Sequence, residues 1–329
     1  MSQTGKKNLV ITSIALYFTY FIHGIGASIM GQYKPELAAH WGAKALSDGT
    51  MDVSMVVSVI AALGLGRLIS LPFSGPLSDK FGRRLSGIIG VICYAAYFMG
   101  IAFAPSMGVA YAFAIVGGIA NSFLDTCVSP TCMEIYVNNP SVANLFTKFS
   151  MCISQFLLPF LIGFVAAANM SYRTIFIVAG AAIFIDGILI LFLPFPDRNT
   201  TGAEKKEKTK LKITPAAIAA ILIGFTSSST FMLWLNCNQE LGKLYNLSDP
   251  SKIQSFYAVG TFCSDPVFLC IYQKRTERDQ YPDHLSADFL YHAGTVLFYP
   301  EPDYLPHRWI CHRFRGRRRC IAAGSFHNR

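Results

Sequence analysis

Charged side chains are scarce in this 329-residue chain. Asp, Glu, Lys and Arg together make up 14% of it, against about 25% in an ordinary soluble domain. Hydrophobic residues make up 52%, and the mean hydropathy is +0.39. This composition argues against a water-soluble globular protein and against a disordered one. Apolar runs of about 20 residues recur instead, and each is long enough to cross a bilayer as an α-helix.

The motifs of common enzyme and metal-binding classes are also missing. The sequence has no Walker loop, zincin helix, nucleophile elbow or dinucleotide glycine pattern, so we expect neither an enzyme nor a cofactor. Its nine cysteines form no CxxC pair, show no ligand-like spacing with histidine and lie mostly in apolar runs. They are predicted to be small core residues rather than disulfides or metal ligands. No cleavable signal peptide is evident, because the first apolar run has the length of a membrane span.

Eight apolar segments are predicted to span the membrane. Their approximate ranges are 9–30, 53–73, 85–104, 108–133, 142–168, 174–194, 213–235 and 253–272. The predicted fold class is therefore an all-α polytopic membrane protein. Residues 1–194 would form a six-helix bundle, 195–212 a basic linker, and 213–264 the first two helices of a second bundle.

The distribution of Lys and Arg predicts how the chain lies in the membrane. Short segments on the side of the N-terminus and the linker hold 11 of these residues, and those on the other side hold 5. Cytoplasmic loops carry an excess of Lys and Arg, so the N-terminus and the linker are predicted to be cytoplasmic. We expect a multi-pass protein of a microbial cytoplasmic membrane. Although the net charge is +9, the charge lies mostly in short loops and in the tail, and nucleic acid is not an expected partner.

A polar island separates the second and third predicted spans. It reads GPLSDKFGRR over residues 75–84, between two apolar segments that together hold one ionisable residue, Arg67. We interpret it as a tight cytoplasmic loop in which Gly75 and Gly82 permit close turning. Its three cations would hold the loop on the positive side of the membrane.

Six spans, a long basic linker, further spans and the pattern GxxxDKxGRR resemble the major facilitator superfamily of secondary transporters. The resemblance covers residues 1 to about 264. It implies two six-helix halves that rock about a central site, with the loop motif acting as a conformational latch. The residues that match the motif are Gly75, Asp79, Lys80, Gly82, Arg83 and Arg84.

In this interpretation Asp79 accepts hydrogen bonds from neighbouring arginines in one state and loses them in the other. Arg67 would snorkel or pair with Asp79, and Glu134, at the cytoplasmic end of the fourth span, would support the latch. The alternative is that the charges of the motif only fix the topology.

Ionisable and polar side chains at membrane depth are the candidates for the solute and proton site. Asp125 lies in the fourth span, with Asn121 one helical turn before it on the same face. The resemblance implies that the first and fourth spans line the cavity, so this pair is the first candidate. A structural hydrogen bond to a neighbouring helix is the alternative. Asp186, in the sixth span, is a possible proton carrier on a helix that is peripheral in this family.

An aromatic and histidine stripe in the first span is the second candidate. It includes Tyr20 and His23, whose rings could stack on a sugar and bond its hydroxyls, although such stripes also serve packing. Weaker candidates are Gln155 in the fifth span and Trp234 with Asn236 in the seventh.

The predicted function is proton-coupled uptake of a small, sugar-like solute by a transporter that is monomeric when complete. The stretch GGIANSFLDT, followed by SPTCMEI, resembles the sugar symporters of the superfamily, and QFLLPFLIGF lacks the glycine-proline signature that many antiporters carry. The coupling ion would be H⁺, with no metal. The alternatives are a drug or metabolite exporter, a non-transporting remnant, and a membrane-tethered regulator that acts through its basic tail.

The tail, residues 265–329, does not continue the pattern of spans. It holds five of the seven histidines and contains RWICHRFRGRRRCIAAGSF. With suitable synonymous codons, a shift of one nucleotide recovers apolar segments over 264–274, 289–307 and 308–326. We therefore predict a frameshift near the codon for Ser264. Transport would be impaired, because the substrate site of such transporters lies between two halves.

Overall fold

The computed structural model of the protein describes residues 3–47, 49–196, 215–248 and 250–262. Six helices in this part are long and apolar enough to cross a membrane. The predicted six-span bundle is therefore confirmed. The helices of the bundle are α1 (Gln3–Gln32), α3 (Ser54–Phe81), α4 (Arg83–Phe103), α5 (Met107–Ile135), α6 (Pro140–Ala167) and α7 (Arg173–Phe192).

Three further helical segments complete the described part. They are the short α2 (Lys34–His40), the long α8 (Pro215–Leu244) and the 3-10 turn η1 (Pro250–Lys252), which leads into a helix over residues 253–262. The helix α2 is not predicted from the sequence. Most of the linker and the whole tail from residue 265 lie outside the described residues, so the predicted frameshift has no structural test here.

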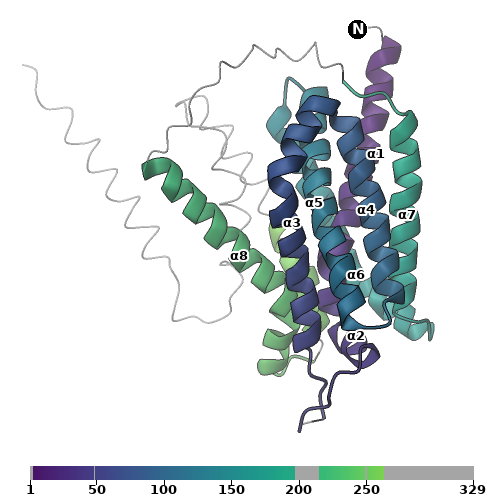
Figure 1. The fold of residues 1–329 in the computed structure, drawn as a ribbon, viewed down its shortest axis with the longest axis vertical. Helices are drawn as coiled ribbons and strands as arrows, with labels where there is room; N and C mark the ends of the chain where they lie inside the picture. The colour runs from purple at the N-terminus through teal and green to yellow at the C-terminus, as the bar shows by residue number, and fades with distance from the viewer. Residues whose placement is uncertain (1–2, 48, 197–214, 249, 263–329) are drawn as a thin grey trace, which may run out of the picture.

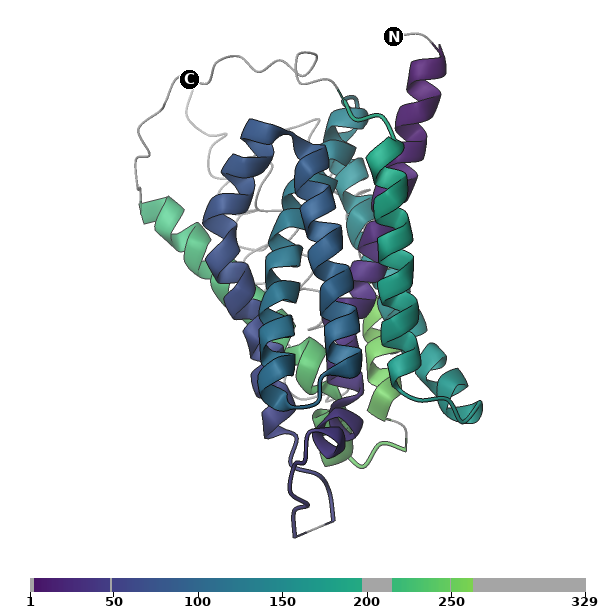
Figure 2. The same cartoon turned by 45° about the vertical axis from the view of Figure 1, so that its right-hand side comes forward.

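The helices of the bundle run alternately between two ends (Figures 1 and 2). One end, which we call the linker end, carries the turn at Gly82 and the end of α7. Here the Thr12 hydroxyl donates to the carbonyl of Pro194 at 2.7 Å, and Arg84 Nη2 donates to that of Leu193 at 2.7 Å. The opposite end, the far end, carries α2. The start of α1 and the start of the linker thus share one end, as the span count predicts.

The polar island is not a loop, which corrects the prediction from the sequence. Helix α3 continues through Phe81 and α4 begins at Arg83, so a single residue, Gly82, makes the turn. Gly82 has φ of +100° and its N–H still donates to the Ser78 carbonyl at 3.0 Å. Gly75 lies inside α3 and makes no turn. The apolar pattern stops at residue 73, but helical hydrogen bonding does not require apolar side chains and continues into the polar segment.

We expect Gly82→Ala to destabilise the protein by about 1–3 kcal/mol, because an L side chain is strained at this backbone conformation. Gly75→Ala is the matched control. A Cβ at Gly75 would meet nothing within 4 Å, and the helix should gain about 0.5–1 kcal/mol. Thermal unfolding in detergent measures both changes. Equal melting temperatures for the two variants would show that the turn does not depend on glycine.

Small residues bring α3 and α5 into close contact. A Cβ at Gly118 would lie 2.1 Å from the Leu63 carbonyl, so the two backbones nearly touch there. The Ser70 hydroxyl donates to the Ser122 hydroxyl at 2.7 Å across the same contact. This close approach places Arg67 of α3 within reach of α5.

Helix α8 lies obliquely to the bundle (Figures 1 and 2). Its C-terminal part contacts α1 at the far end, where Ala27 packs against Leu235 and Tyr257. Its N-terminal end lies away from α3. The two parts of the chain on either side of the linker therefore meet mainly toward the far end.

Candidate functional site

Asp125 is the centre of a polar cluster built from three helices. The Tyr20 hydroxyl of α1 donates to Oδ1 at 2.6 Å, and Arg67 Nη2 of α3 donates to Oδ2 at 2.5 Å. Both carboxylate oxygens are thus occupied by donors. The structure corrects the expected partner of Arg67, which pairs with Asp125 and not with Asp79. The reason is the close contact of α3 with α5, which the sequence of either helix does not reveal.

The ion pair between Arg67 and Asp125 lies at a depth where a lone charge would be costly. The Arg67 side chain is 40% exposed and that of Asp125 is 27% exposed within the protein, so the pair is partly accessible. Each charge offsets the other. Adding a proton to Asp125 would remove the negative charge and weaken the hold on Arg67, so the cluster can link protonation to helix packing.

His23 extends this cluster toward α4. Its ring lies 5.4 Å from that of Tyr20 and stacks on that of Tyr94 at 5.6 Å. The side chain is 6% exposed, and its Nδ1 has no hydrogen-bond partner among the described residues. The structure therefore joins Tyr20, His23 and Asp125, which the sequence presents as two separate candidates.

Buried amides without partners lie on α5 and α6. Asn121 Oδ1 makes no hydrogen bond with the described residues, and neither does either amide atom of Gln155. Gln155 is fully buried. It follows Ser154, whose hydroxyl lies against Gly24 of α1, and precedes Phe156, whose carbonyl accepts from Ser255 at 3.0 Å. Gln155 is thus located where α1, α6 and the helix over 253–262 come together.

Trp234 and Asn236 lie nearer the far end than Asp125 does. Trp234 packs with Tyr257 at a ring distance of 6.1 Å, and its Nε1 has no partner among the described residues. Asn236 lies against Gly31, eleven residues after Tyr20 on α1, or roughly 16 Å along the helix. The structure therefore does not bring Asn236 to Asp125.

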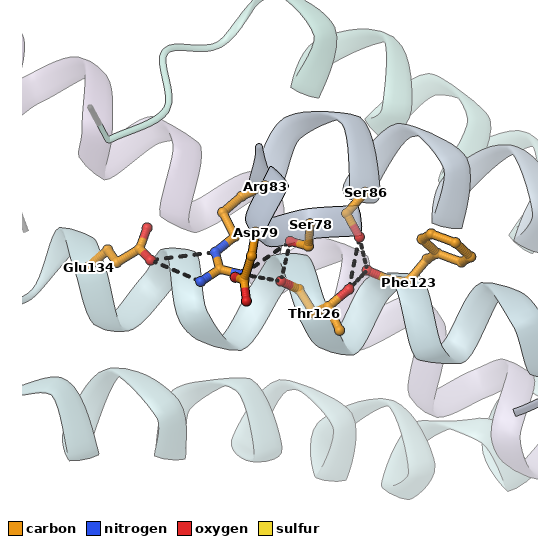
Figure 3. A network of polar contacts seen from close by, with 7 residues as sticks. All are labelled: Ser78, Asp79, Arg83, Ser86, Phe123, Thr126 and Glu134. Atoms are coloured by element: carbon orange, nitrogen blue, oxygen red, sulfur yellow. Dashed lines mark hydrogen bonds and ion pairs between the residues drawn. The ribbon is translucent and has the colours of Figure 1, made fainter. Parts of the chain in front are cut away.

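A second polar cluster, at the linker end, surrounds Arg83 (Figure 3). The guanidinium donates to Asp79 Oδ1 at 2.8 Å, to the Ser78 hydroxyl at 3.1 Å and to Glu134 Oε1 at 3.4 Å. The Ser78 hydroxyl donates to the Thr126 carbonyl at 3.1 Å. Arg83 thus connects the end of α3 with the start of α4 and with α5. We call this the Arg83 cluster.

The other cations of the motif make different contacts. Arg84 donates a hydrogen bond to the carbonyl of Leu193, and its guanidinium lies 5.3 Å from the centre of the Phe195 ring. Lys80 lies over the ring of Phe81 at 5.2 Å. Within the motif, Arg83 thus connects α3 and α4 with α5. Arg84 connects α4 with the end of α7, and Lys80 contacts the neighbouring Phe81 ring.

Two polar contacts between helices are missed by the sequence-based prediction. The Thr19 hydroxyl donates to Asp186 Oδ2 at 2.6 Å, joining α1 to α7. Lys34 Nζ pairs with Glu240 Oε1 at 2.5 Å, joining α2 to α8. Asp186 alone is visible in the sequence, as an ionisable residue in a span. The ion pair of Lys34 joins residues more than 200 positions apart, and no local pattern indicates it.

Known proteins are similar to this chain in sequence and in fold. The family model "Major Facilitator Superfamily" matches residues 16–270. The inner membrane transport protein YdiM of Escherichia coli is 34% identical over 271 residues, covering 79% of this chain and 63% of YdiM. YdiN of the same bacterium is 27% identical, covering 89% of this chain and 69% of its own length. The quinolone resistance protein NorA of Staphylococcus aureus is 27% identical over 217 residues, 63% of this chain and 53% of NorA.

Solved transporters have the same fold. The inward-open structure of the xylose transporter XylE from E. coli aligns with 89% of this chain and 81% of its own, with a TM-score of 0.62 and 14% identity. The peptide transporter POT aligns with a TM-score of 0.55 and 15% identity. At these identities the likeness concerns the fold alone. The chain spans slightly less than two thirds of the length of YdiM. With its family match, its relatives and its fold in agreement, the chain belongs to the major facilitator superfamily.

Proposed function

We propose that the full-length protein imports a small, sugar-like solute together with protons by alternating access. This proposal rests on the observation that the carboxylate of Asp125 accepts hydrogen bonds from both Arg67 and Tyr20. Protonation of Asp125 would weaken contacts that hold α1, α3 and α5 together. A proton would therefore favour one conformation over another, which is the linkage that symport requires.

The unpaired polar atoms near this cluster support an uncharged, hydroxyl-rich solute. Asn121 Oδ1 can accept a hydrogen bond, and Gln155 can both donate and accept. A buried amide without a partner costs about 1–3 kcal/mol, so these groups favour binding of a molecule that satisfies them. Sugar hydroxyls both donate and accept. The apolar face of a sugar ring could pack on Tyr20 and His23.

Export of a drug or metabolite is the second candidate function, and the relationship to NorA favours it. A third possibility is that the present chain does not transport, because it spans 63% of the length of YdiM and alternating access needs both halves. We further propose that the N-terminus is cytoplasmic and that the membrane is the cytoplasmic one. The excess of Lys and Arg at the linker end supports this orientation.

Transport by the full-length gene product in membrane vesicles tests the proposal. An inward proton gradient should drive accumulation of one or more labelled sugars from a panel, while preloaded quinolones should not leave faster than from empty-vector vesicles. Extrusion of quinolones without sugar accumulation would favour the exporter. Parallel vesicles that contain only the 329-residue chain show whether this chain transports.

Replacing Gln155 with leucine tests the role of its unpaired amide. We expect the affinity for the transported solute to fall about tenfold or more, because the amide would lose its hydrogen bonds to the solute. Protein stability should not fall, since leucine has a similar volume and carries no unpaired polar atom. Solute binding and thermal unfolding are measured on the same preparation. Unchanged affinity would remove Gln155 from the proposed site.

A further inference from the structure

The two parts of the chain are joined at the far end by a polar cluster that the proposed function does not use. Lys34 Nζ pairs with Glu240 Oε1 at 2.5 Å and donates to the carbonyl of Asn236 at 2.5 Å. Gln239 Nε2 donates to Gln32 Oε1 at 2.6 Å, and Gln32 Nε2 donates to Gln254 Oε1 at 2.5 Å. We call this the far-end cluster. Its members are Gln32, Lys34, Asn236, Gln239, Glu240 and Gln254.

The far-end cluster connects the end of α1 and the start of α2 with α8 and with the helix over residues 253–262. Its first-half members precede the linker by more than 160 residues, so no local folding holds them against α8. Every bond named above crosses from the first half to the second. The cluster therefore exists only while the two halves are in contact at this end.

Most side chains of the far-end cluster are buried, so each of them needs its polar partner while the far end is closed. The side chain of Lys34 is 1% exposed and that of Glu240 is 41% exposed, while Gln32 and Gln254 are buried. A buried ammonium that loses its partner is strongly destabilising unless water reaches it. Separation of the halves at this end would supply that water. The ion pair is thus compatible with two states, one closed with Lys34 buried against Glu240, the other open with Lys34 hydrated.

The Arg83 cluster at the linker end differs in this respect. Its named members, among them Asp79, Thr126 and Glu134, all belong to α3, α4 and α5 of the first half. The start of α8 lies away from α3 (Figures 1 and 2). Among the described residues, the polar contacts of the far-end cluster join the two halves. Those of the Arg83 cluster join helices of the first half only.

We infer that the far-end cluster is a gate, in which the ion pair between Lys34 and Glu240 holds the far end closed and separates when that end opens. This inference rests on the proposed alternating access. The three glutamines fix the register of the closed state. The hydrogen bond between Gln239 and Gln32 requires a specific position of α8 relative to α1, and the one between Gln32 and Gln254 requires a specific position of the helix over residues 253–262. Asn236, a candidate for solute contact from the sequence, is assigned to this gate through its backbone carbonyl.

Distances between spin labels at the far end test the gate in the 329-residue chain. Labels are attached at Ala39→Cys on α2 and Leu244→Cys on α8, both exposed positions, in a background with the native cysteines replaced by serine. We expect one short distance in the parent. Lys34→Glu places two like charges together and should shift the closed-to-open equilibrium toward longer distances by about tenfold or more. Glu240→Lys should do the same, and the double reversal should restore the short distance.

A second label pair within the first half, Ala39→Cys with Ala168→Cys, is the matched control. Its distance should stay the same in every variant, because both positions belong to the first half of the chain. An unchanged distance between Ala39 and Leu244 in Lys34→Glu would overturn the proposal. Lengthening of both pairs would overturn it too, since the ion pair would then hold the fold and not a gate. These distances need no solute or proton gradient, so the gate can hold even where the proposed symport fails.

Discussion

Replacing Asp125 with asparagine is expected to abolish proton-driven solute accumulation by the full-length transporter. Asparagine keeps the shape of the side chain and can still accept the hydrogen bond of Tyr20, but it cannot take up and release a proton. Arg67 would lose its counter-charge permanently. The protein would then resemble its protonated state at every pH. Accumulation should fall to the level of vesicles without transporter, while exchange of solute across the membrane at equal proton concentration should continue.

Asp186→Asn is the matched control for this prediction. Asp186 is also a buried carboxylate at membrane depth, but its described partner is a single hydroxyl, that of Thr19. An amide can still accept that hydrogen bond, so we expect accumulation to persist. If Asp186→Asn lost proton coupling while Asp125→Asn kept it, the proton site would be Asp186 on α7 and not Asp125 on α5.

Arg83→Ala is expected to produce the largest loss of stability among substitutions of the charged residues of the motif. The substitution removes every contact of the guanidinium with Asp79, Ser78 and Glu134 and leaves Glu134 partly buried without a counter-charge. We expect a loss of about 2 kcal/mol, corresponding to a melting temperature lower by roughly 5 °C. Thermal unfolding in detergent of the 329-residue chain measures this effect, because all members of the cluster lie in the first half.

Arg84→Ala provides the comparison, since it removes an equal charge from an exposed neighbouring position. Arg84 makes one hydrogen bond, to the Leu193 carbonyl, and its loss should cost less than 1 kcal/mol, about the value of a single exposed contact. Asp79→Asn should also be mild in this chain, because Asp79 is 68% exposed. In the full-length transporter we still expect Asp79→Asn to impair transport. Equal melting temperatures for Arg83→Ala and Arg84→Ala would contradict the assigned role of Arg83.

The number and order of the first six spans could be predicted from the sequence. The hydropathy and the length of a segment determine whether it crosses a membrane as a helix. The helix ends were predicted less well. The span predicted to end at residue 73 continues as helix to Phe81, since polar side chains do not stop helical hydrogen bonding at the membrane surface. Gly82 makes the turn, as predicted, whereas the prediction that Gly75 also makes a turn is wrong.

Pairings between helices could not be predicted, because they depend on how the helices pack. Asp125 is conspicuous in the sequence as a charge within a span, yet its partner Arg67 follows only from the close contact of α3 with α5. The same limit applies to Lys34, which has no neighbour in sequence that identifies Glu240. Single residues at unusual depth can thus be found from a sequence, whereas their partners need the fold.

The predicted frameshift near the codon for Ser264 remains a prediction. The family model ends at residue 270, close to Ser264. The alignment with YdiN covers 89% of the chain, which is more than the 264 residues ahead of the predicted break and so includes part of the tail. The nucleotide sequence of the gene decides whether another frame encodes further spans.

The most direct test of proton-coupled uptake is the pH of the medium around vesicles that carry the full-length transporter. With no gradient imposed, addition of a transported sugar should make the weakly buffered medium more alkaline, because protons enter with the solute. The Asp125→Asn variant should show no such change. Acidification on addition of solute, or solute entry without any change of pH, would contradict symport.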